Sequence, residues 1–192
     1  MGIGTAMIGA AALLAVAYLN SFVAEIYRRF LDSTTLAAAL AGELKSHFSA
    51  FPVLNGMFDT LLVTAKAGSA IPLRRIPTPT DPIFDAAATK IGLLGTTLAR
   101  DTVYIYEQLR AFRIAMDIIA EFHQEMESAE LEHRLTHCKN IIGNSTEKIE
   151  QLIGNLEEFA QRKFVKVPQG WVSFIDGRGT GQAEQERQTG KP

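Results

Sequence analysis

Apolar side chains recur along most of the chain at spacings of three and four residues, the period of an α-helix with one buried face. The first stripe consists of Leu36, Leu40, Leu44, His47, Phe48 and Phe51. Pro52 interrupts this stripe, which resumes at Phe58, Leu61 and Leu62. The pattern predicts an all-α fold with an amphipathic, juxtamembrane helical region over residues 25–68.

Two longer stripes follow, and in both of them the steps between apolar positions alternate four and three, as in a heptad seam. The first seam consists of Leu98, Thr102, Ile105, Leu109, Phe112, Met116, Ile119, His123 and Met126. The second seam consists of Leu131, Leu135, Cys138, Ile142, Ser145, Ile149, Leu152, Leu156 and Phe159. The longer step from Met126 to Leu131 breaks the phase. We therefore predict a small bundle containing a long antiparallel helical hairpin that turns around Glu127 to Ala129.

The N-terminal stretch from Ile3 to Ala24 carries no charged side chain. As a helix it would be about 33 Å long, enough to cross the hydrocarbon core of a bilayer. We predict a transmembrane anchor over residues 1–24. A cleaved signal peptide is one alternative, because Ala15, Val16 and Ala17 resemble a cleavage site, and a buried soluble helix is another.

The charges around this stretch predict its orientation. Arg28 and Arg29 follow the apolar run, and neither Lys nor Arg precedes it. The positive-inside rule then predicts a single span with the rest of the chain in the cytoplasm. The missing N-terminal basic residues also argue against a signal peptide.

A proline-rich stretch predicts a linker over residues 69–82. Asp81 and Pro82 are typical of a helix start, because the Asp side chain can accept amide protons and proline at the first position loses no hydrogen bond. We expect the short helix from Ile83 to Ile91 to stop at Gly92, in the left-handed conformation that closes helices.

The residues after this stop should form a corner between two helices. Leu93 or Leu94 should fold back on the last turn, and Thr96 or Thr97 should cap the next helix. We interpret the corner as a packing joint. A β-branched residue at Gly92 should then cost more than about 1 kcal/mol, and Ala at Gly95 should cost less.

The C-terminal end has an apolar part and a polar part. Residues 164–175 are apolar and β-favouring, and we expect an extended cap that completes a helical domain over residues 83–175. Contact with lipid headgroups is the weaker interpretation of Trp171, Phe174, Lys163 and Lys166. Residues 176–192 are polar and rich in Gly, which predicts a disordered tail.

Composition excludes some classes of function. The formal net charge is −2 and no face is crowded with Lys and Arg, so we expect no nucleic acid partner. The single cysteine, Cys138, excludes an internal disulfide. On a seam it should behave as a small apolar side chain rather than a nucleophile.

Three histidines near the predicted turn raise the question of a metal site. His133 and His137 are spaced four residues apart, as zinc ligands can be, with Glu130 one turn away. However, the heptad frame puts His123 on the seam and the other two on outer positions, which argues against a shared site.

The remaining motifs are weaker. Residues 176–181 resemble a phosphate-binding loop but lack the helix that should follow it. The helical spacing of Tyr104, Tyr106, Phe112 and Phe122 favours the core over a ligand site. The sequence therefore predicts no catalytic, cofactor-binding or metal-binding residue, and no cofactor.

Residues 83–106 and an earlier helix carry a resemblance to other proteins. The matching residues are Phe84, Ala87, Lys90, Ile91, Gly92, Leu93, Leu94, Leu98, Val103 and Tyr106, with the segment ALAGELKSHF before them. On these residues the chain resembles a group of uncharacterised bacterial single-span membrane-anchored helical proteins, which usually carry proline where this chain has Gly95. The resemblance covers about residues 1–112. It implies an anchored protein of the bacterial inner membrane with a cytoplasmic helical domain.

These features favour a membrane-anchored cytoplasmic helical protein that serves protein–protein association or scaffolding. Its partner would be another protein or a second copy of the chain. The alternative is a ligand or metal sensor that uses the histidine-bearing tip of the hairpin. We do not expect an enzyme, because no catalytic arrangement can be recognised among the residues.

Overall fold

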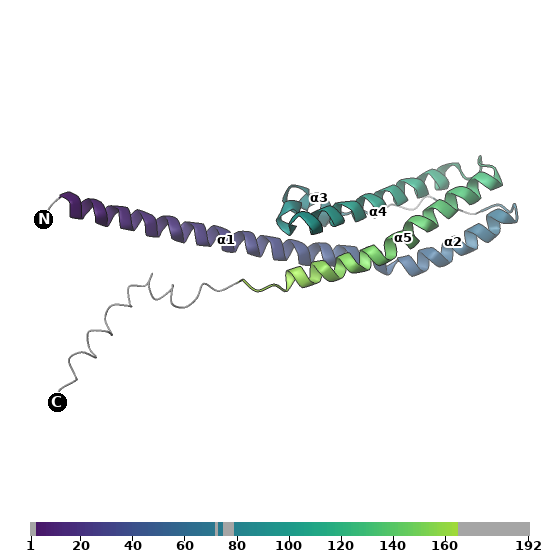
Figure 1. Cartoon of the computed structure of the whole chain (residues 1–192). Helices are drawn as coiled ribbons and strands as arrows, with labels where there is room; N and C mark the ends of the chain where they lie inside the picture. Colours follow the sequence, from purple (N-terminus) through teal and green to yellow (C-terminus); the bar gives the residue numbers. More distant parts are fainter. Residues whose placement is uncertain (1–2, 72, 75–78, 165–192) are drawn as a thin grey trace, which may run out of the picture. The chain divides into compact units, whose positions relative to one another are not determined.

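The described part of the chain is helical. A computed structural model describes residues 3–71, 73–74 and 79–164, and these ranges contain no strand. In chain order the elements are α1 (Ile3–Ser49), α2 (Phe51–Lys66), α3 (Pro82–Ala87), the 3-10 helix η1 (Ala88–Leu94), α4 (Thr96–Phe122) and α5 (Ser128–Ala160) (Figure 1). The all-α prediction is confirmed for these residues.

The chain divides into two compact units. One is Asp32–Arg162, and the other combines Met1–Leu31 with Lys163–Pro192. Helix α1 begins in the second of these units and ends in the first. Several predicted features lie outside the described residues: the extended cap beyond Phe164, the residues Lys166, Trp171 and Phe174, the 176–181 motif and the disordered tail.

The unit Asp32–Arg162 is built around α5, which packs against α4 and against α2 (Figure 1). The last part of α1 adds its apolar face to the same core, where Leu40 and Leu44 are fully buried. Phe58 of α2 is also fully buried. The first predicted stripe is therefore a core face, and its break at Pro52 coincides with the start of α2.

Burial along α5 follows the second predicted seam. Every seam residue from Leu131 to Leu156 is buried, and Phe159 packs partly buried against the core. These positions lie on one side of the helix because steps of three and four residues come close to the period of 3.6 residues per turn. The second seam is confirmed as a buried face.

The first seam holds along α4 but not beyond it. Thr102, Ile105, Leu109 and Ile119 are buried, and Leu98, Phe112 and Met116 are partly buried. Helix α4 ends at Phe122, and the connection to α5 covers residues 123–127. His123 and Met126 therefore lie in the turn. Our placement of the turn at Glu127 to Ala129 was wrong, because Glu127 is the extended residue before α5 and Ser128 is already helical.

In the unit that contains the start of α1, aromatic rings join α1 to the segment that follows α5. Phe164 packs edge-on against Tyr27 with ring centroids 5.1 Å apart, and against Phe30 at 5.2 Å. Edge-to-face packing places the positive rim of one ring against the negative face of another.

The corner between α3 and α4 differs from the prediction. Gly92 does not have a positive φ, and the 3-10 helix continues through it to Leu94. Gly95 ends that helix instead, with φ 80° and ψ 167°, and its N–H donates to the Gly92 carbonyl at 3.1 Å. Leu94 is buried as expected, whereas no side chain caps α4. The predicted roles of Gly92 and of Thr96 or Thr97 were therefore wrong.

This correction reverses the expected effects of two substitutions. Gly95→Ala should lower the free energy of unfolding by about 1–3 kcal/mol, because its φ and ψ lie in a region that is essentially restricted to glycine. Gly92→Ala should be neutral or stabilising by up to about 1 kcal/mol, since no atom lies within 4 Å of an added Cβ and Ala is less flexible when unfolded. Urea unfolding of both variants checks this. A larger loss for Gly92→Ala would contradict it.

Candidate functional site: a buried polar cluster between α1, α3 and α4

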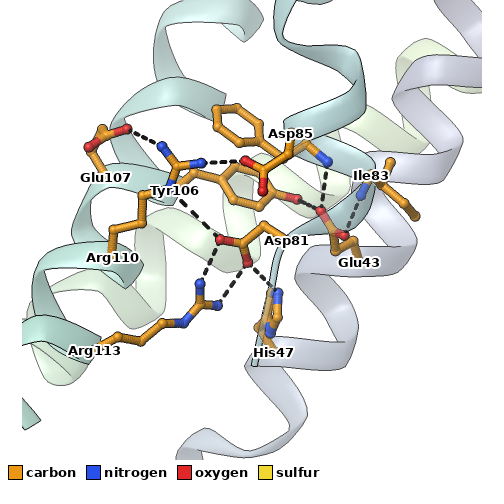
Figure 2. Close-up of polar contacts among 10 residues, drawn as sticks. Glu43, His47, Asp81, Ile83, Asp85, Tyr106, Glu107, Arg110 and Arg113 are labelled. Atoms are coloured by element: carbon orange, nitrogen blue, oxygen red, sulfur yellow. Dashed lines mark hydrogen bonds and ion pairs between the residues drawn. The ribbon is translucent and has the colours of Figure 1, made fainter. Parts of the chain in front are cut away.

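A cluster of polar side chains lies buried where α1, α3 and α4 meet (Figure 2). We define the α1–α4 polar cluster as Glu43, His47, Asp81, Tyr106, Arg110 and Arg113. Glu43 and Asp81 are buried carboxylates, at 8% and 3% exposure. A buried carboxylate is costly unless it is paired and hydrogen-bonded, so its partners decide what the cluster does.

Glu43 caps the start of α3 from a different helix. Its Oε1 accepts the Ile83 amide at 2.9 Å, and its Oε2 accepts the Phe84 amide at 3.1 Å. The first amides of a helix have no partner within the helix, and the positive end of the helix dipole favours a carboxylate there. Glu43 therefore binds α3 to α1.

This arrangement corrects the predicted role of Asp81. Asp81 does stand at the position before α3, and Pro82 lies in the first turn, but the Asp81 side chain makes no capping hydrogen bond. Its backbone carbonyl accepts the Asp85 amide at 2.9 Å. Because Glu43 satisfies the free amides, the carboxylate of Asp81 is available to α4.

Asp81 pairs with α4 through Arg113. The two Arg113 Nη atoms donate to the two carboxylate oxygens at 2.5 and 2.8 Å, which is the strong fork-to-fork geometry of this ion pair. His47 Nε2 lies 2.9 Å from Asp81 Oδ1, in ion-pair range but not aligned for a hydrogen bond. Burial by itself raises the pKa of Asp81, yet Arg113, with His47 and Arg110, holds that pKa below its ordinary value.

Arg110 closes the exposed side of the cluster. Its guanidinium donates to Asp85 at 2.5 Å and to Glu107 at 3.0 Å, and lies 4.0 Å from Asp81. The same group stands over the Phe84 ring at 5.3 Å. These contacts hold the first turn of α3 against α4.

Tyr106 connects the apolar and polar parts of the cluster. Its ring stacks on Phe84 with centroids 4.0 Å apart, and its hydroxyl donates to Glu43 Oε2 at 2.7 Å. Burial and the neighbouring Glu43 carboxylate both raise the pKa of Tyr106, so the phenol stays protonated and acts as a donor. Chemically, each carboxylate of the cluster is satisfied, Asp81 by Arg113 and Glu43 by neutral hydrogen-bond donors, so the cluster joins three helices rather than presenting an activated group.

The predicted histidine constellation comes together only in part. His133 and His137 line one groove of about 380 Å³ with Ala115, Ile119, Glu130 and Arg134. Glu130 is engaged by Arg134 at 2.8 Å, and His123 lies in the turn, with Nδ1 3.2 Å from the Ala120 carbonyl. Within the described ranges, no three His, Cys, Asp or Glu side chains are placed to hold a metal ion.

The other predicted candidates take separate places. Cys138 is fully buried, and burial raises the pKa of its thiol to about 11, which suits packing and not nucleophilic attack. Of the aromatic set, Tyr106 is buried and Phe112 packs against Phe58 at 6.0 Å. Tyr104 and Phe122 are exposed, so the prediction that all four belong to the core was wrong for these two.

Sequence reasoning missed most of the α1–α4 polar cluster. One available signal was His47 within an otherwise apolar stripe. Another was Glu43, which shares a helix face with His47 because the two are four residues apart. A polar residue on a core face needs a buried partner, so this pair pointed to a polar contact. Nothing local identified Arg113 as the partner of Asp81.

The fold and the cluster define a class of protein, an all-helical protein whose bundle is joined by a buried polar cluster. One helix near its N-terminus is long and apolar enough to cross a membrane, judged by length and composition. Comparison with models of known families, with curated proteins and with solved structures finds no match. The resemblance to bacterial single-span proteins therefore stays a prediction.

Proposed function

We propose that the protein is anchored in the bacterial inner membrane by a single span, and that residues 32–162 form a cytoplasmic domain for protein–protein association. The observation that carries this proposal is the exposure of the apolar side chains described between Leu13 and Ile26 in α1.

Helix α1 changes character along its length. Near its start, Leu13 and Tyr18 are each 73% exposed, and Leu19, Phe22, Val23 and Ile26 are exposed as well. Near its end, Leu40 and Leu44 are fully buried. A helix that is apolar on all sides requires a core or a bilayer, and the first part of α1 has little core around it. Of the most apolar stretch of 18 residues between Val16 and Lys66, only 17% is buried.

The orientation rests on the charges after the apolar segment. Arg28 and Arg29 both bond to Glu25, at 2.6 and 2.8 Å. Pairing with Glu25 changes the predicted orientation little. The positive-inside rule counts Lys and Arg residues, whereas Asp and Glu contribute little to orientation. We therefore keep the cytoplasmic assignment for the domain that follows.

The role in association rests on the state of the α1–α4 polar cluster. Asp81 is paired with Arg113, Glu43 is hydrogen-bonded to the start of α3 and to Tyr106, and Tyr106 is held protonated, so this site supports the architecture of the domain. A compact domain with a membrane anchor is suited to presenting its outer surfaces to a partner. Affinity capture from solubilised membranes, with metal analysis of the same sample, tests this role against the sensor alternative.

Membrane anchoring makes a direct prediction. The protein should stay in the membrane fraction after carbonate extraction, and a C-terminal reporter that works only in the cytoplasm should be active. Extraction by carbonate, or activity of a reporter that requires the opposite side, would contradict the proposal. N-terminal sequencing separates the signal-peptide alternative, which predicts a mature chain that begins at Tyr18.

We also propose the register in which α4 and α5 pair. In an antiparallel hairpin the two seams bring Ile119 opposite Cys138, and both residues are fully buried. The contact of Lys148 with the Tyr104 hydroxyl, at 3.5 Å, supports this direction of pairing.

A designed cysteine tests the register. Ile119→Cys should form a disulfide with Cys138 within one chain, since facing seam residues approach the Cα separation of about 5.5–7 Å at which a disulfide closes. The expected result is faster migration on a non-reducing gel, and wild-type chain is the control. Oxidation should be carried out at alkaline pH because burial raises the thiol pKa. Intermolecular dimers alone would contradict the hairpin.

A further inference from the structure

The second half of α4 carries apolar side chains that face solvent. Ile114, Ile118 and Phe122 follow one another at steps of four residues, which places them along one side of the helix. Their exposures are 61%, 37% and 41%. We call these three residues the α4 outer stripe. Single exposed apolar residues are ordinary, whereas a continuous row of them is typical of an interaction site.

Acidic groups surround the end of this stripe. Glu121 lies on α4 beside Phe122, and Glu125 and Glu127 follow in the turn. All three are exposed, and none of their side chains forms an ion pair with another residue of the described part of the chain. The end of the stripe therefore carries uncompensated negative charge.

A groove borders the stripe on the side of α5. Its volume is about 380 Å³, and Ala115 and Ile119 form its wall on α4. These residues directly follow Ile114 and Ile118, so they lie about 100° around the helix from the stripe, on the neighbouring side. On α5, the guanidinium of Arg134 is held by Glu130 at 2.8 Å, which removes much of the positive charge from this wall. The stripe and the groove together form an exposed apolar surface next to a recess.

We propose that the α4 outer stripe and this groove form the docking surface for a basic amphipathic helix of a partner protein. The proposal rests on the proposed role in association and specifies the partner for it. The apolar side of such a helix would cover Ile114, Ile118 and Phe122, as in other helix-in-groove complexes. Its Lys and Arg side chains would pair with Glu121, Glu125 and Glu127, which favours fast and specific association.

The same charges disfavour the other occupants. A second copy docked with parallel stripes would bring two acidic ends toward each other, and like charges across an interface are unfavourable. In an antiparallel copy each acidic end would lie near the start of the other stripe, where Arg113 is already paired with Asp81. An anionic lipid surface would be repelled for the same reason, because membrane-surface helices carry Lys and Arg on their polar side. A basic protein helix satisfies both the apolar and the acidic parts of the surface.

The test uses the full chain in nanodiscs of neutral lipid. It is titrated with a fluorescent synthetic helix that has leucines at helical spacing and lysines elsewhere, and with a matched helix that carries glutamates in place of the lysines. Empty nanodiscs correct for lipid binding. The lysine helix should bind at least about 10-fold more tightly than the glutamate helix, and its affinity should fall as salt increases.

Surface variants locate the binding. Ile114→Ser combined with Ile118→Ser should weaken binding of the lysine helix at least about 10-fold. Glu121→Lys combined with Glu125→Lys should remove most of the salt dependence. Val53→Ser on α2 is the control, since Val53 is also exposed but lies on another helix. All these positions are exposed, so thermal melting should stay unchanged and a folding defect would be visible.

Three outcomes would overturn the proposal. They are equal binding of the two synthetic helices, normal binding by the stripe variants, and a dimer of the chain that the stripe variants dissolve. None of these affects the carbonate and reporter tests, so membrane anchoring is judged separately. A protein partner that the stripe variant still retains would support association through another surface and would reject this one.

Discussion

Arg113→Met should destabilise the domain by about 3–5 kcal/mol, because it leaves the Asp81 carboxylate buried without its main counter-charge. Asp81 is 3% exposed, and both of its oxygens accept hydrogen bonds from Arg113. Methionine conserves much of the length and apolar volume of the arginine stem, so the loss reports mainly on the charge. Urea unfolding at pH 7 measures the effect.

The pH dependence of stability provides a second measurement on the same variant. The pKa of Asp81 is lowered below its ordinary 3.8 in the folded protein, so its pairing stabilises the fold above that value. This contribution is lost as the pH falls through the folded pKa. The free energy of unfolding of Arg113→Met should therefore fall less than that of the wild type as the pH is lowered through the folded pKa of Asp81.

A matched control separates this ion pair from general effects of losing an arginine. Arg100 lies on the same helix and is exposed, and its partner Asp101 is adjacent in sequence. Arg100→Met should change the free energy of unfolding by less than about 1 kcal/mol, as is usual for surface ion pairs. Equal losses in the two variants would show that the burial of Asp81 has no special importance.

Glu43→Leu should cost about 2–4 kcal/mol, since it leaves two amides of α3 and the Tyr106 hydroxyl without their acceptor. An unsatisfied buried donor costs about 1–3 kcal/mol. Thermal and urea unfolding measure the loss. A neutral result would mean that α3 is not held by this carboxylate.

Tyr106→Phe is the matched control for this prediction, because it removes one of the three donors and keeps the ring that stacks on Phe84. It should cost about 0.5–1.5 kcal/mol, clearly less than the loss of Glu43. The double variant should be less destabilised than the sum of the two single variants, because they share one hydrogen bond.

The helices and their buried faces could be predicted because the periodicity of apolar residues records them directly. Leu40 and Leu44 on α1, and the seam from Leu131 to Leu156 on α5, are buried where the pattern placed them. Pro52 likewise marked the start of a helix, since proline is tolerated in a first turn and not in a helix interior. Such signals depend only on neighbours along the chain.

Other features required the packed helices. By sequence alone, Gly92 and Gly95 are equally able to end a helix. In the structure Gly95 does so, because a 3-10 helix continues through Gly92 to the buried Leu94. The turn at residues 123–127 has no Gly or Pro to mark it.

The α1–α4 polar cluster shows the limit most clearly. Glu43 bonds to Tyr106 across 63 positions of sequence, and Asp81 bonds to Arg113 across 32. The sequence by itself determined where the long helical segments lie and which side of each is apolar. Only the tertiary structure decided which charges meet, because side-chain pairing over such separations depends on how the helices pack. The periodicity of apolar residues contains no information about this packing.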